Sequence, residues 1–192
     1  MKKLLLILIL TFNFQTLTKA DDIRDFQIEG MSIGDSALDY FSKSTLKKNK
    51  RLNWFDTKKF TPIAELYLSS ATIYESFQIT VKTNDEDYKI QSLSGFIFYR
   101  NNDFYKCNLQ LDDIAKEIKK LFNNVRDDGK QTYKHSFDKS GKSKITAIHL
   151  TLVNGDRVGI QCIDWAEKYT YLDQLRISIS TKEFDKFLNT AY

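Results

Sequence analysis

Two stretches of the chain, residues 60–100 and 131–180, alternate apolar and polar side chains, and an amphipathic stretch separates them. In the first stretch Phe77, Ile79 and Val81 alternate with polar neighbours, the period of a strand with one buried face. The first stretch predicts three strands and the second predicts four. Strands that come in runs, with helices between the runs, favour α+β over alternating α/β topology. We therefore predict an α+β fold, with an antiparallel sheet of about seven strands in two meanders and the helices packed on one face.

Three helices are expected around this sheet. The longest covers Leu109–Val125, begins after Asn108 as its N-cap, and places its apolar residues on one face. A short helix is expected after Ser32, and a final helix is expected after Ser180, each with an acidic residue three positions later as in a capping box. A glycine within the predicted third strand, Gly95, suggests a β-bulge there.

The register of one hairpin follows from its apolar pattern. A two-residue turn before Asp156 would place Leu150 opposite a glycine, whereas a three-residue loop over residues 153–155 places it opposite Val158. A shift of one residue moves every side chain to the other face of the sheet. We predict the longer loop, which puts Cys162 on the core face and His149 on the opposite face.

The N-terminus has the layout of a secretory signal peptide. Two lysines precede the apolar run Leu4–Leu10, and Thr18–Ala20 places small residues before a cut at Asp21. The run is too short to cross a bilayer of about 30 Å as a helix, although an uncleaved N-terminal anchor is the alternative. We predict a signal peptide over residues 1–20 and one α+β domain over residues 21–192. We expect this domain to reside in the periplasm or to be secreted, and to have no transmembrane segment after cleavage.

Cleavage would also change the charge balance. The chain has 29 basic and 25 acidic residues, and the predicted signal peptide contains three of the lysines and none of the acids. The remaining chain is close to neutral, so its charge gives no reason to expect a nucleic-acid partner.

The chain has two cysteines, Cys107 and Cys162. In an exported protein, one pair most simply predicts a disulfide. Closing a loop of this length would stabilise the fold by up to about 4 kcal/mol. The alternatives are two buried thiols, a nucleophilic cysteine or a metal ligand.

No motif for catalysis is present: the sequence has no nucleophile elbow, phosphate loop, zinc-ligand spacing or paired-carboxylate signature. We therefore expect no cofactor and no metal. His135 and His149 are expected to be strand residues, and residues 138–141 a turn, although they resemble a fragment of a calcium loop. Trp165 is expected to cap the core beside the disulfide or to stack on a ligand.

One segment has a local excess of positive charge. Residues 43–60 contain seven basic residues and one acid, interleaved with aromatic side chains. Such a segment could contact an anionic envelope surface, formed by lipid headgroups or a polyanionic glycan, or an acidic protein partner. It could also be a solvated connector whose aromatic residues enter the core. As the partner-binding candidates we take Lys47, Lys48, Arg51, Trp54 and Phe55.

Residues Ile28–Phe41 contain a hydrophobic–Gly–Met–Ser sequence followed by a short apolar pattern. This stretch resembles the start of small exported bacterial proteins. It is also similar to the opening helix of the BamE/SmpA-OmlA and β-lactamase-inhibitor-like group, which are small binding modules of helices and an antiparallel sheet. The resemblance implies an envelope protein without enzymatic activity, and it assigns no site residues.

The sequence thus favours an exported binding or adaptor protein without catalytic activity. The alternatives are a small-ligand carrier with an aromatic pocket, or an enzyme whose site is built from scattered residues. A pocket holding His149 with an acid would favour the enzyme, and a large apolar cavity the carrier. An exposed aromatic patch would favour a protein partner.

Overall fold

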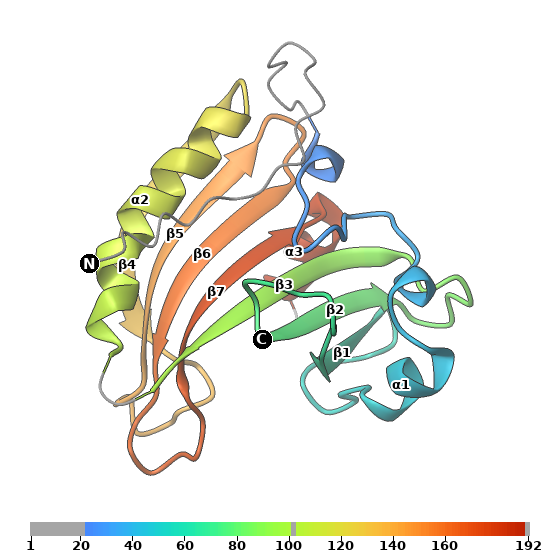
Figure 1. The fold of residues 1–192 in the computed structure, drawn as a ribbon, viewed down its shortest axis with the longest axis horizontal. Coiled ribbons are helices and arrows are strands. Elements are labelled where there is room, and N and C mark those ends of the chain that lie inside the picture. Colours follow the sequence, from blue (N-terminus) through green and yellow to red (C-terminus); the bar gives the residue numbers. More distant parts are fainter. Residues whose placement is uncertain (1–21, 101–102, 191–192) are drawn as a thin grey trace.

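A computed structural model of the chain describes residues 22–100 and 103–190, so the predicted signal peptide and its cleavage site lie outside the described residues. One antiparallel sheet of seven strands has the order β1-β2-β3-β7-β6-β5-β4 (Figure 1). The strands are β1 (Phe60–Leu66), β2 (Ser76–Lys82), β3 (Ile90–Tyr99), β4 (Val125–Lys134), β5 (Lys144–Leu152), β6 (Arg157–Asp164) and β7 (Asp173–Ser180). The α-helices are α1 (Lys43–Lys48), α2 (Tyr105–Leu121) and α3 (Lys182–Leu188), and two 3₁₀ helices, η1 (Ile23–Asp25) and η2 (Ala37–Asp39), precede them.

The sheet consists of two meanders joined edge to edge. β1, β2 and β3 pair consecutively, as do β4, β5, β6 and β7, and the meanders meet where β3 pairs with β7. The predicted α+β class, the strand number and the two meanders are confirmed.

One face of the sheet is apolar and covered; we call it the covered face. The central strands contribute Ile160, Cys162, Leu175 and Ile177, all buried. Against them α2 buries its apolar stripe, while α1 adds Leu46 and the N-terminal segment adds further apolar residues to the same core. At about 25 cal/mol per Å² of apolar surface removed from water, this layer is the main stabilising contribution to the fold.

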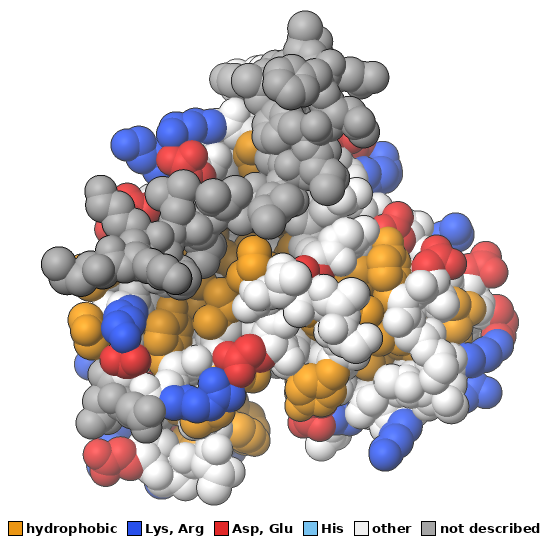
Figure 2. Space-filling view, viewed as in Figure 1, with side chains coloured by type: hydrophobic (Ala, Val, Ile, Leu, Met, Phe, Trp, Pro, Cys, Tyr) orange, Lys and Arg blue, Asp and Glu red, His pale blue; other side chains and the backbone are white. Residues whose placement is uncertain are grey.

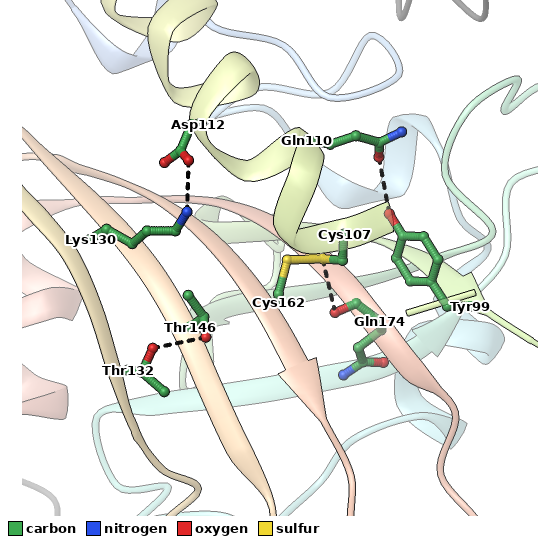
Figure 3. The surroundings of a disulfide bond; sticks show 9 residues. All are labelled: Tyr99, Cys107, Gln110, Asp112, Lys130, Thr132, Thr146, Cys162 and Gln174. Atoms are coloured by element: carbon green, nitrogen blue, oxygen red, sulfur yellow. Dashed lines mark hydrogen bonds and ion pairs between the residues drawn. A yellow bond between two sulfur atoms is a disulfide. The ribbon is translucent and has the colours of Figure 1, made fainter. Parts of the chain in front are cut away.

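The predicted disulfide is present and joins α2 to β6. The Cα atoms of Cys107 and Cys162 lie 5.9 Å apart, and the two residues are separated by 55 positions in sequence. Figure 3 shows two further links between α2 and the sheet: Lys130 of β4 pairs with Asp112 at 2.7 Å, and Tyr99 of β3 donates a hydrogen bond to the helix. The helix is therefore fixed covalently at one end and by polar contacts along its sides.

The other face, which we call the open face, is mostly polar and carries α3. Phe60 of β1 points to this face, where its ring lies 5.2 Å from that of Phe184 and 5.1 Å from that of Phe187. The expectation that all helices pack on one face therefore holds for α1 and α2 but not for α3. The cause is local: β1 buries an aromatic residue on the open face, and the apolar stripe of α3 covers it.

The hairpin register predicted from the sequence is confirmed. Leu150 pairs with Val158 and Ile148 with Ile160. Gly155 has a φ of +90°, which a residue with a side chain rarely adopts. His149 lies opposite Gly159 on the open face, as expected.

Three local predictions were wrong. The helix α2 begins four residues before the expected start and ends before Val125, which opens β4 instead. No α-helix follows Ser32: its backbone N–H donates to Asp35, as in a capping box, but its hydroxyl donates to the Phe26 carbonyl and not to the next turn. Gly95 marks no bulge, because it pairs in regular register with Phe77 of β2 and Ile177 of β7. A Cβ there would lie 2.5 Å from the Tyr74 ring, so the glycine makes room for that ring.

Candidate functional site

Five rings gather at one end of the open face, where the β4–β5 and β6–β7 connections extend below the sheet in Figure 1. Trp165 is central: its ring lies 4.4 Å from His135, 4.8 Å from Tyr171 and 5.8 Å from Tyr169. Phe137 completes the group at 5.7 Å from Tyr169. We call these five residues the aromatic cluster.

The aromatic cluster is anchored on one side and exposed on the other. Trp165 packs against a small buried group of Ile145, Ala147 and Ile163 on the open face. Phe137 remains 58% exposed and Tyr171 54% exposed. Large rings held in place yet open to water are typical of contact surfaces, because they bring apolar area at a low entropic cost.

A buried carboxylate holds the two connections together. The Asp138 side chain is 0% exposed and forms an ion pair with Lys168 at 2.7 Å. It accepts hydrogen bonds from the hydroxyls of Ser140 and Ser143, from their backbone N–H groups, and from the Tyr169 hydroxyl. Residues 138–141 form a turn, as predicted, and Asp138 links that turn to the β6–β7 connection.

Electrostatics keep this carboxylate ionised. The hydrogen-bonded ammonium of Lys168 and the donors from Ser143 and Ser140 hold the pKa of Asp138 far below its usual range, against the opposing effect of desolvation. Burial and the charge of Arg176 lower the pKa of His135, so its ring is neutral near pH 7. The aromatic cluster therefore lies beside an ionised carboxylate, that of Asp138, whose charge is balanced by Lys168.

Exposed lysines lie in the two connections that carry the aromatic cluster. Lys139 and Lys142 are exposed in the turn between β4 and β5, and Lys168, which pairs with Asp138, is exposed in the β6–β7 connection. Lys134 and Lys144 pair with each other at the ends of β4 and β5 and point to the covered face, away from the rings. In the β6–β7 connection the exposed acid is Glu167. The two connections that carry the rings therefore have only a small excess of positive charge, from Lys139 and Lys142.

The predicted partner-binding segment, residues 43–60, lies elsewhere, around α1 and before β1. Lys47 and Lys48 are exposed at the end of α1, and Trp54 is 42% exposed. Arg51 pairs with Glu65 at 2.6 Å. Phe55 packs on α3, with its ring 5.4 Å from that of Phe187.

This segment therefore combines both expected behaviours. Lys47, Lys48 and Trp54 face solvent, while Phe55 contributes to packing within the protein.

Figure 2 shows the face on the α2 side, where charged side chains stand mostly around the outline and hydrophobic side chains show in the middle.

The open face also contains a small cavity of about 140 Å³ under α3. His149, Arg157, Gln161, Arg176, Ser178 and Ser180 are among the residues that line it, and we call it the polar pocket. Asp185 contributes a carboxylate, but among the described residues no hydrogen bond joins His149 to an acid or to a serine. A catalytic dyad is thus not assembled there.

Three absences hold for the described residues alone. No three side chains of the metal-binding types come together. No helix combines the length and the apolarity that crossing a membrane requires. The two cysteines are both in the disulfide.

The comparisons with known proteins give no relative: no family model, no curated protein and no solved structure matches this chain. The functional argument therefore depends on the geometry of the chain itself.

Sequence reasoning placed Trp165 beside the disulfide, and this was wrong: the ring packs on the open face, away from Cys162. It also took Asp138 for an ordinary turn residue and missed the ring contacts between two connections about 30 residues apart. One signal was present: both connections carry aromatic residues next to charged ones, at Phe137 and at Tyr169.

Proposed function

We propose that this is an exported, disulfide-bonded binding protein that acts in the periplasm or outside the cell, without catalysis, and that the aromatic cluster is its contact surface. The observation that carries the proposal is the combination of exposed rings with a rigid base. Phe137 and Tyr171 remain more than half exposed although the loops that carry them are held by Asp138. Exposed apolar side chains in rigid loops lose little conformational freedom on binding.

The partner proposed is a protein with an apolar side chain flanked by acidic residues. The rings offer flat apolar surface, and the exposed Lys139 and Lys142 in the turn that follows Phe137 favour a negative partner through long-range attraction and selectivity. At physiological ionic strength this attraction extends about 8 Å, so the rings would supply most of the binding free energy.

The export proposal is supported by the arrangement of the cysteines. A disulfide that fixes the longest helix to a central strand suits an oxidising compartment. The predicted cut before Asp21 is tested by the intact mass of the protein recovered from outside the cytoplasm. Retention of residues 1–20 would contradict it.

The contact surface is tested by comparing three variants for retention of the partner from an envelope extract. Phe137→Ala with Tyr171→Ala removes the exposed rings. Tyr67→Ala with Tyr105→Ala is the matched control, because these tyrosines are 69% and 60% exposed but lie outside the aromatic cluster. Lys47→Glu with Lys48→Glu and Trp54→Ala tests the basic segment.

We expect the first variant to lose at least about tenfold in affinity, as for a hot-spot residue worth more than 1.4 kcal/mol. The control should bind as the wild type does. Loss of binding in the basic-segment variant alone would move the contact surface to residues 43–60 and overturn the assignment to the aromatic cluster.

A further inference from the structure

The two edges of the sheet differ in what covers them. Beyond β1, residues 49–51 run alongside the strand, and the Arg51 N–H donates to the Pro62 carbonyl at 2.9 Å. Beyond β4, no further strand or bridge follows among the described residues. The protein therefore covers part of one edge with its own chain and leaves the other edge open.

Every second residue of β4 turns its backbone groups to the open edge. The His135 N–H donates to the Ser143 carbonyl at 2.9 Å, so alternate residues back along the strand use their backbone groups on β5. The residues between them pair with β5 without exchanging backbone hydrogen bonds. The N–H and C=O groups that point away from the sheet are those of Lys130, Thr132 and Lys134.

The open part of this edge is regular and exposed. A bulge between Asp127 and Lys130 interrupts the pairing with β5, and beyond it residues 130–134 pair in unbroken register and are all exposed. In Figure 3 the Thr132 hydroxyl lies 3.0 Å from that of Thr146, as in a closely spaced pair without backbone hydrogen bonds. An exposed edge of this kind is a template for pairing with about five residues of another chain.

A second copy of this chain fits the edge poorly. Antiparallel pairing of two β4 strands about Thr132 would place Lys130 of each copy opposite Lys134 of the other. Like charges directly opposite each other are destabilising, and lysines on an edge strand commonly prevent self-association. The edge therefore favours a strand of different sequence.

The two sides of an added strand would meet different chemistry. On the open face β4 presents Tyr133, which is 40% exposed, and beyond it the aromatic cluster begins with His135 and Phe137. On the covered face it presents Lys134, which is exposed and has no ion pair among the described residues. Lys130 is on the same face, but it is already paired with Asp112. One side of the edge is thus aromatic, and the other has one unpaired positive charge.

The nearest acids in the row of Lys134 lie on inner strands. Lys144 of β5 is its cross-strand partner, and Asp164 of β6 is the partner of Lys144. Burial, then the charge of Asp173, raises the pKa of Asp164, and the charge of Lys144 opposes this effect. Lys144 thus interacts with these acids, whereas Lys134 is at the outer end of the row. An acidic side chain on a strand outside β4 would lie beside Lys134.

We propose that an extended segment of a partner protein adds to β4 as a further antiparallel strand, with apolar and acidic side chains in alternation. Its apolar side chains lie on the open face, against Tyr133 and the aromatic cluster. Its acidic side chains lie on the covered face, beside Lys134. Backbone hydrogen bonds contribute affinity and the alternating side chains contribute specificity. This inference rests on the proposed function, because it states how the partner's segment reaches the aromatic cluster.

The probe is a synthetic peptide with blocked ends, Glu-Val-Glu-Phe-Glu-Val-Glu. Its control has the same composition without the alternation, Glu-Glu-Val-Phe-Val-Glu-Glu. Amide exchange of the folded protein, followed by NMR, reads out the pairing. We expect the alternating peptide to slow exchange at the outward amides of Thr132 and Lys134, while the control peptide leaves both unchanged.

Methylation of the peptide backbone tests the direction of its hydrogen bonds. Residues directly opposite each other in an antiparallel pair share one face of the sheet, so the acidic residues of the peptide direct their backbone groups to β4. N-methylation of the two inner Glu residues should therefore weaken binding at least about tenfold, as expected when hydrogen bonds are lost. N-methylation of the two Val residues is the matched control and should leave affinity near that of the parent peptide.

Two protein variants test the same edge. Thr132→Pro removes an outward N–H and no hydrogen bond to β5, and proline is tolerated on edge strands; we expect a loss of at least about tenfold in affinity for the alternating peptide. Lys134→Glu should weaken binding severalfold, and by less at 1 M salt, where the screening length is about 3 Å. Lys89→Glu, at an exposed lysine of the other meander, should bind as the wild type does. If Thr132→Pro does not fold, the N-methylated peptides provide the test.

Three results would overturn strand addition. The first is unchanged exchange at Thr132 and Lys134 with the alternating peptide at about 2 mM, a concentration that detects dissociation constants in the millimolar range. The second is equal affinity of the two N-methylated peptides. The third is wild-type affinity in a folded Thr132→Pro variant.

Retention of the partner from the envelope extract separates this inference from the proposed function. Retention by Thr132→Pro but not by Phe137→Ala with Tyr171→Ala would keep the aromatic cluster as the contact surface and reject strand addition. The reverse result would keep strand addition and reject the aromatic cluster.

Discussion

The two faces of the sheet use the same strands for opposite purposes. On the covered face, consecutive inward residues such as Val158, Ile160 and Cys162 are buried and apolar. On the open face, the residues between them are Gly159 and Gln161, beside Arg157, and they line the polar pocket. Because side chains alternate along a strand, β6 contributes to the core with one set of residues and to the lining of the polar pocket with the other.

The difference indicates where stability and recognition reside. The covered face contributes the buried apolar area and the disulfide. The open face contains a cavity, a buried guanidinium nitrogen without a partner among the described residues, and exposed rings. Features of this kind lower stability or add nothing to it, and proteins retain them mainly at functional sites.

Neighbouring residues of β6 give the sharpest test of this comparison. Ile160→Ala removes a fully buried side chain from the covered face and should lower the free energy of unfolding by about 2–5 kcal/mol. Gln161→Ala, one position along and on the open face, should change it by no more than about 0.5 kcal/mol. Urea unfolding of both variants measures the contrast, and similar losses would show that the two faces contribute alike.

The disulfide should be the next largest contribution. Replacing Cys107 and Cys162 by serine should lower the free energy of unfolding by up to about 4 kcal/mol, since the unfolded chain regains the freedom of a loop of 55 residues. Thermal unfolding measures the loss. The aromatic cluster lies on the other face, so the fluorescence of Trp165, measured in a Trp54→Phe background because the chain has two tryptophans, should stay unchanged below the transition. An altered spectrum would show that the faces are coupled.

A smaller and more local effect is expected at Asp138. Asp138→Asn removes the charge that binds Lys168, so amide exchange should speed up in residues 135–143 and 165–172 but not in α2. The folded pKa of Asp138 lies below its ordinary value, so its stabilising effect is present above about pH 3.9 and decreases as the pH falls further. Acid unfolding should therefore be less steep in the variant, and an identical acid transition would contradict this role.

The sequence was sufficient to predict the regularly paired strands of this molecule and its cross-link. The strand number, the hairpin register at Leu150 and the disulfide all follow from alternation and from cysteine pairing, which are local or nearly unique signals. The start of α2 was missed because no side-chain cap marks Phe104. The position of α3 was not predicted because the sequence does not show that Phe60 of β1 points to the open face. Phe184 of α3 contacts Phe60 there.

The candidate sites were harder to foresee, for a physical reason. Both are formed by residues that are distant in sequence and brought together by strand pairing. His149 was placed correctly beside Gly159, but Arg176 comes to this face only through the β6–β7 register, in which it pairs with Gln161. Asp138 joins two connections through a buried ion pair that no local pattern encodes.

The central claim is that the open face binds the partner through the aromatic cluster, and site-specific photo-crosslinking in the exporting cell tests it most directly. One photoreactive residue replaces Tyr171 in the aromatic cluster, and in a second protein it replaces Tyr105 on α2, which is similarly exposed. The account predicts one discrete crosslinked species from position 171, lost on Phe137→Ala, and none from position 105. Crosslinking from position 105 alone, or equally from both positions, would contradict it.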